Sequence, residues 1–161
     1  MTPTDLQPRL DPGALAPALF KKYLDFALTS TLDEGLALLV DIRASQLNGC
    51  AFCLDMHVKQ ARIAGERELR LHHVAIWRES PLFNPKERAA LAWTERLTRL
   101  GSDGVTDADY RQTCDHFDEP TLVELTFRVM AINGWNRLNI AFRRIPGSLD
   151  RAYGLDKAGL N

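Results

Sequence analysis

The sequence lacks the features that would assign it to several specialised classes of protein. No apolar run in its 161 residues approaches the roughly 18 that a membrane-spanning helix needs. The N-terminus has no basic start followed by an apolar block, so we expect no secretory signal and a cytoplasmic location. The net charge of −1 gives no electrostatic reason to expect a nucleic acid or a membrane as a partner.

Cysteine is also scarce. There are three cysteines, an odd number, and two of them, Cys50 and Cys53, are separated by only two residues. Structural disulfides are rare in a reducing cytoplasm, where a close cysteine pair is more often catalytic or metal-binding. The third, Cys114, stands alone, and we expect an inert thiol that is buried or half-buried.

Strand signals are absent, whereas helix signals are frequent. No segment shows sustained two-residue alternation of apolar and polar residues, and no Asn-Gly or Asp-Gly pair lies between strand-like segments. Cap patterns at Thr31, Asn84 and Thr106 each precede an apolar series with helical spacing. A longer helix follows from residue 119 towards the Pro-Gly pair at 146–147. The sequence therefore predicts an all-α chain of roughly seven helices, forming one domain over residues 1–161.

The segment "NGCAFCLDMH", residues 48–57, carries the chemistry. We expect Asn48 to cap a helix on which Cys50, Cys53 and His57, spaced by three and four residues, share one face. The helix start and the imidazole both lower thiol pKa, and the thiolate is the reactive form. This arrangement suits a peroxide-reducing or disulfide-exchanging site in which one thiolate attacks, the other resolves, and His57 moves the proton.

Other interpretations of the same segment remain to be weighed. A zinc site needs about four ligands, so His72 or His73 would have to join the three residues named above. A c-type haem attachment requires His directly after the second Cys, and Leu54 in that position excludes it. The residues could also simply fill the core, because free cysteine is often buried.

The segment "RASQLNGCAFCLDMH", residues 43–57, closely resembles the AhpD-like alkylhydroperoxidases of the carboxymuconolactone decarboxylase superfamily. The resemblance continues in "AIWRESPLFNPKERAALAWTERLT", residues 75–98, and in "AINGWNRLNIAF", residues 131–142. It implies an AhpD-like all-helical domain that needs no cofactor and no metal, and that assembles as a homo-oligomer, a trimer or a hexamer.

The resemblance also implies roles for individual residues. Cys53 corresponds to the cysteine that attacks a hydroperoxide substrate, Cys50 to its disulfide partner, and His57 to part of the proton relay. An external dithiol reductant, such as a lipoylated protein, would then restore the pair. The alternatives are a carboxymuconolactone decarboxylase-type reaction, or a non-catalytic redox-sensing or zinc-sensing oligomer.

One position departs from the family pattern. The peroxidases usually carry a glutamate twelve residues before the first cysteine, and this sequence has Leu38 there. Glu34 and Asp41 lie about one helical turn on either side of Leu38, and Glu79 is a more distant candidate. We therefore expect that, if a relay acid exists, one of these three carboxylates supplies it.

Overall fold

The computed structural model describes residues 6–160 and confirms the all-α prediction. Within these residues there are nine α-helices and two short 3₁₀ helices, with no strand; seven of the α-helices have six residues or more. The α-helices are α1 (Pro12–Leu15), α2 (Pro17–Leu28), α3 (Glu34–Asn48), α4 (Ala51–Ile63), α5 (Glu68–His73), α6 (Pro85–Thr98), α7 (Asp107–Cys114), α8 (Glu119–Ala141) and α9 (Asp150–Tyr153). The 3₁₀ helices are η2 (Val74–Ile76) and η3 (Leu155–Ala158).

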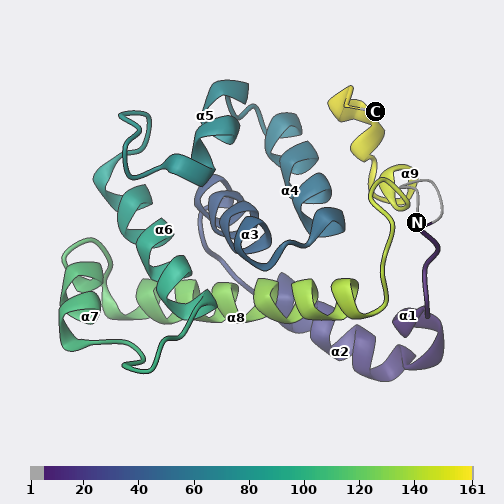
Figure 1. Cartoon of the computed structure of the whole chain (residues 1–161), viewed down its shortest axis with the longest axis horizontal. Helices are drawn as coiled ribbons and strands as arrows, with labels where there is room; N and C mark the ends of the chain where they lie inside the picture. Colours follow the sequence, from purple (N-terminus) through teal and green to yellow (C-terminus); the bar gives the residue numbers. More distant parts are fainter. Residues whose placement is uncertain (1–5, 161) are drawn as a thin grey trace.

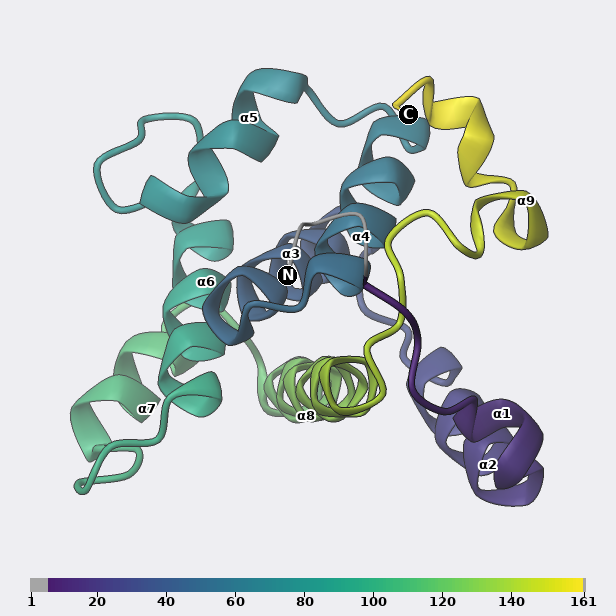
Figure 2. The same ribbon diagram turned by 45° about the vertical axis from the view of Figure 1, so that its right-hand side comes forward.

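Helix α3 lies at the centre and packs against α4, α6 and α8 (Figure 1). Helices α1 and α2 form an arm that leads away from this body (Figure 2), and α2 packs against the middle of α8. At the other end of the chain, η3 packs back onto α4. No helix in the described part of the chain is both long and apolar enough to span a membrane.

Of the cap patterns predicted at Thr31, Asn84 and Thr106, the last two are confirmed and the first is wrong. Asn84 and Thr106 begin α6 and α7 with complete capping boxes. Thr31 does not cap α3: its amide and hydroxyl both donate to the carboxylate of Glu124 on α8. The cap is Asp33, which accepts from the amide of Leu36 at 3.0 Å. A partner distant in the sequence has thus displaced the local role of Thr31.

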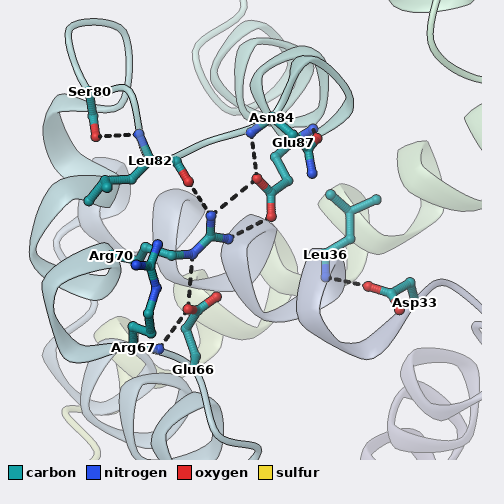
Figure 3. Close-up of polar contacts among 9 residues, drawn as sticks. All are labelled: Asp33, Leu36, Glu66, Arg67, Arg70, Ser80, Leu82, Asn84 and Glu87. Atoms are coloured by element: carbon teal, nitrogen blue, oxygen red, sulfur yellow. Dashed lines mark hydrogen bonds and ion pairs between the residues drawn. The ribbon is translucent and has the colours of Figure 1, made fainter.

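Arg70 on α5 fixes the loop between η2 and α6 (Figure 3). Its guanidinium donates to the carbonyl of Leu82 and to Glu87, and its Nε donates to Glu66 at 2.9 Å. Glu87 also accepts from the amide of Asn84 at 2.8 Å, so the capping box and the arginine share one carboxylate. These contacts stiffen the side of the molecule that supports α3 and α4.

The arm depends on a close approach between α2 and α8. The hydroxyl of Tyr23 donates to the carbonyl of Ala131 at 2.8 Å, and its ring lies 4.8 Å from that of Trp135. Gly134 makes this contact feasible, because a Cβ at that position would lie only 1.9 Å from the Tyr23 oxygen. The absence of a side chain at Gly134 therefore allows α2 to pack closely against α8.

Gly134→Ala is expected to push α2 away from α8 and lower the free energy of unfolding by about 1–3 kcal/mol. Urea denaturation measures this loss, and faster proteolysis within residues 12–28 would locate it. Gly101→Ala is the matched control, because a Cβ there meets no atom within 4 Å. Equal stability of the two variants would contradict the proposed seating of the arm.

Candidate active site

The site begins where α3 turns into α4. Gly49 ends α3 with a φ of 70°, a left-handed conformation that glycine adopts without strain. Asn48, the predicted cap of the next helix, is instead the last residue of α3, and its amide donates to Asn133 and Asn136 on α8. Cys50 takes the capping position: its sulfur accepts from the backbone amide of Cys53 at 3.3 Å. The prediction for Asn48 was wrong because its side chain bonds across to another helix.

Cys50 and Cys53 form a disulfide, with their Cα atoms 5.4 Å apart. Both are almost completely buried, at 2% and 0% exposure. The two sulfurs have different surroundings. Cys50 bonds to the first turn of α4, whereas Cys53 lines a cavity and accepts a contact from Nδ2 of Asn139 at 3.4 Å. The cysteines therefore differ in their neighbours, and of the two only Cys53 belongs to the cavity wall.

The cavity that Cys53 lines has a volume of about 320 Å³, at the small end of the range for ligand pockets. It lies between the arm, α4, the second half of α8 and the C-terminal segment. Most of its wall is apolar, and the larger contributors are Phe20, Phe52, Met56, Ile132, Trp135 and Leu149. An organic molecule with an apolar body can be desolvated against such a wall.

His57 lies one turn after Cys53 on α4 and lines the same cavity. Its Nδ1 donates to Oε1 of Gln60 at 2.8 Å and lies 3.4 Å from Oδ2 of Asp41. These acceptors favour the tautomer with hydrogen on Nδ1, which leaves Nε2 as the basic atom. Burial lowers the pKa of His57 below its ordinary value of 6.5, while the nearby Asp41 raises it and Arg128 lowers it. A neutral imidazole of this kind can accept a proton.

Among the three candidate acids, Asp41 is the one that the structure places beside His57. Asp41 is 1% exposed and accepts a bidentate contact from Arg128 on α8, with 2.9 Å between Nε and Oδ1. Glu34 and Glu79 are both exposed. Leu38, which replaces the family glutamate, packs in the apolar cluster with Trp77 instead. The carboxylate next to the histidine therefore comes from a position three residues after Leu38.

The other residues singled out in the sequence lie elsewhere. His72 is exposed near Glu68, and Nδ1 of His73 bonds to the hydroxyl of Ser80 at 3.0 Å. Over residues 6–160, no three His, Cys, Asp or Glu side chains are arranged to hold a metal ion, so the zinc interpretation gains no support. Cys114 was predicted to be buried or half-buried, but it is exposed, because the buried residue at the end of α7 is its neighbour Thr113.

Sequence reasoning missed three contributors: Gln60, Arg128 and Asn139. Arg128 and Asn139 lie on α8 among apolar residues, where isolated polar side chains are unusual in a buried helix. Asn133, Asn136 and Asn139 recur every three residues, which places them near one another on the helix. That spacing was the available signal that one face of α8 meets a polar site.

The chain was compared with known proteins. Residues 15–96 match the Carboxymuconolactone decarboxylase family. The uncharacterized protein YdfG of Bacillus subtilis (strain 168) is 38% identical over 130 residues, which cover 79% of this chain and 88% of YdfG.

The solved structures with a similar fold include the following two. One is ATU0492 of Agrobacterium tumefaciens, a protein of unknown function with a suggested place in antioxidant defence as AhpD. It has a TM-score of 0.83 and 34% identity, covering 87% of this chain and 98% of that one. The other is an uncharacterized peroxidase-related protein of Ralstonia eutropha JMP134, an alkylhydroperoxidase AhpD core. It has a TM-score of 0.74 and 20% identity, covers 84% of this chain and 74% of that one, and supports the fold alone. The chain therefore belongs to the carboxymuconolactone decarboxylase family and has the helical fold of its AhpD-like members.

Proposed function

We propose that the protein is a thiol-dependent peroxidase that reduces hydroperoxides through a Cys50–Cys53 disulfide cycle. The observation that carries this proposal is the position of Cys53. Cys53 lines an apolar cavity, is bonded to Cys50, and lies one turn before a histidine whose Nδ1 is 3.4 Å from a buried carboxylate. A dithiol, a basic imidazole and a pocket for an organic molecule together are what hydroperoxide reduction requires.

In the reduced protein, His57 accepts the proton of the Cys53 thiol, and Asn139 donates to the resulting thiolate. The thiolate attacks the outer oxygen of the hydroperoxide ROOH. The O–O bond breaks, Cys53 becomes a sulfenic acid, and the alkoxide leaves as the alcohol ROH with the proton returned from His57. Asp41, itself fixed by Arg128, keeps the imidazole oriented and stabilises its charged form.

Cys50 completes the cycle from its position as helix cap. The hydrogen bond that its sulfur accepts from the amide of Cys53 favours a thiolate. This thiolate attacks the sulfur of the Cys53 sulfenic acid and forms the disulfide, and the departing hydroxide takes up the proton that the Cys50 thiol gave up and leaves as water. An external dithiol then attacks the sulfur of Cys53, the cysteine that lines the cavity, and Cys50 leaves as the stabilised thiolate. The second thiol of the reductant displaces Cys53. Because the disulfide is buried, a small dithiol or a dithiol on a slender arm, as in a lipoylated protein, fits this step.

The alternatives use the site less completely. Lactone decarboxylation needs no dithiol, so the Cys50–Cys53 pair would have no role in it. A redox sensor needs the cysteines but has no use for an apolar cavity of about 320 Å³.

We also propose that the protein forms a homo-oligomer. Val123, Phe127 and Met130 form an apolar stripe on α8 and are 54%, 48% and 55% exposed. The arm continues this surface with exposed apolar side chains at Leu19, Phe26 and Leu28. The rings of Phe26 and Phe127 lie 5.9 Å apart and join the two sets, and an exposed apolar surface of this kind is typical of a protein interface.

Substitutions of the two cysteines are expected to block different steps of the cycle. Cys53→Ser should reduce peroxide consumption, measured with dithiothreitol or dihydrolipoamide, to the uncatalysed background. Cys50→Ser should still consume one equivalent of peroxide and accumulate the Cys53 sulfenic acid, seen as one added oxygen by mass spectrometry and trapped by dimedone. Cys114→Ser is the control and should keep full activity. If Cys50 were the residue oxidised in the first step, the roles assigned above would be reversed.

Asp41→Asn is expected to lower kcat/KM for the hydroperoxide roughly a hundredfold, because the imidazole loses its orienting carboxylate. Glu34→Gln and Glu79→Gln are matched controls and should retain the activity of the unaltered protein. Circular dichroism is the check that Asp41→Asn is folded, because the substitution also weakens the ion pair with Arg128. An unchanged kcat/KM in Asp41→Asn would remove Asp41 from the relay.

The pH profile separates the relay role of Asp41 from a structural one. Activity requires neutral His57, so kcat/KM should fall on acidification through the pKa of His57. Burial lowers that pKa, and the acid limb should therefore lie below pH 6.5. Asp41 raises the pKa, so Asp41→Asn should move the limb to still lower pH. A limb that stays in place in a folded Asp41→Asn variant would show that Asp41 does not act on His57.

Met130→Glu is expected to reduce the oligomer to smaller species, because it places a charge in the apolar stripe. Sedimentation velocity measures the change. Ile76→Glu is the matched control: Ile76 is 58% exposed but lies on η2, far along the chain from the stripe. A monomeric unaltered protein, or an equal effect of both substitutions, would contradict the proposed interface.

A further inference from the structure

Two arginine side chains reach the mainly apolar cavity, and their surroundings differ. Arg128 is engaged in the bidentate contact with Asp41. Arg144 follows the end of α8 and lies over the ring of Phe52, 5.7 Å from its centroid. With His57 neutral and the cysteines in a disulfide, Asp41 balances one of these two guanidinium charges. The described wall of the cavity therefore carries one uncompensated positive charge.

Arg144 is only weakly paired among the described residues. Its side chain is 20% exposed, and its one carboxylate contact is with Oδ1 of Asp11 at 3.4 Å. That oxygen already accepts from the amides of Gly13 and Ala14 as the cap of α1, and the Asp11 side chain is 65% exposed. A long contact to a solvated, shared oxygen leaves most of the guanidinium's donors available.

We propose that Arg144 makes the cavity selective for organic hydroperoxides that carry a carboxylate. This inference rests on the proposed peroxidase function and names its substrate class. The apolar body of the substrate lies against Phe52 and Trp135, the hydroperoxide group meets Cys53, and the carboxylate binds the guanidinium of Arg144.

The chemistry favours a carboxylate for two reasons. The planar guanidinium matches its two oxygens, and a charge-assisted hydrogen bond is stronger in a half-buried site than in water. Hydrogen peroxide has no apolar group and no carboxylate, so Arg144 should not affect the rate at which it is reduced.

The test uses pairs of substrates that differ in charge and by a single methyl group: para-carboxycumene hydroperoxide and a medium-chain hydroperoxy fatty acid, each compared with its methyl ester. In the unaltered protein, kcat/KM is expected to be at least about tenfold higher for the acid than for the ester. Arg144→Gln should abolish this ratio by slowing the acids about tenfold, while the esters and hydrogen peroxide keep their rates.

Two variants guard against a merely structural effect. Asp11→Asn keeps a good helix cap but removes the ion pair with Arg144, so the acid-to-ester ratio should be unchanged or higher. Arg111→Gln removes an exposed arginine on α7, outside the cavity, and should change no rate. If Arg144→Gln slowed acids, esters and hydrogen peroxide equally, or if the ratio survived in Arg144→Gln, the inference would be wrong.

A binding experiment separates this inference from the peroxidase proposal. Binding of 4-isopropylbenzoate and of its methyl ester to the oxidised protein is followed by tryptophan fluorescence, because Trp135 lines the cavity. The carboxylate should bind about tenfold more tightly than the ester, and Arg144→Gln should remove the difference. If no hydroperoxide is consumed, the proposed function fails, and the binding ratio alone decides the inference. If hydroperoxides are consumed but the binding ratio is one, only the inference fails.

Discussion

The arrangement of the central helices depends on one buried ion pair, between Asp41 on α3 and Arg128 on α8. A carboxylate that is 1% exposed is very costly to bury unless a cation and hydrogen bonds compensate it. Arg128 provides both, and the pairing requires α8 to lie beside the middle of α3. His57 on α4 meets the same carboxylate. Three helices thus converge on this carboxylate, and the candidate site is built around it.

A second polar contact fixes the other end of the site. Asn48, the last residue of α3, donates to Asn133 and Asn136, and Asn136 donates in turn to Ser45 at 3.0 Å. These bonds hold the turn between α3 and α4 against α8. The next asparagine on that face, Asn139, reaches the sulfur of Cys53. The position of Cys53 therefore follows from the packing of α8 as well as from its place on α4.

The local part of the site could be predicted from the sequence, and the distant part could not. Spacings of three and four residues fix Cys53 and His57 on one face whatever surrounds the helix. The caps at Asn84 and Thr106 were predicted correctly because all their partners lie within three residues. Thr31 and Asn48 have equally good local patterns, but their side chains bond to α8, and nothing in their own segments indicates this. Local rules failed where a tertiary partner competed with the backbone for the same side chain.

The identity of the carboxylate beside His57 also depends on tertiary contacts that its own segment does not indicate. The sequence alone did not distinguish Glu34, Asp41 and Glu79 as relay acids, and the position of the family glutamate is occupied by Leu38. Burial separates them, since Glu34 and Glu79 face solvent and need no partner. A buried acid does need one, and α8 offers Arg128 between the apolar residues Phe127 and Val129. An arginine between apolar residues in a packed helix implies a carboxylate opposite it, so the two unusual residues identify each other as a pair. The loss of a glutamate at Leu38 thus leaves the histidine with a carboxylate neighbour, because the acid lies one turn further along α3 with its own counter-charge in place.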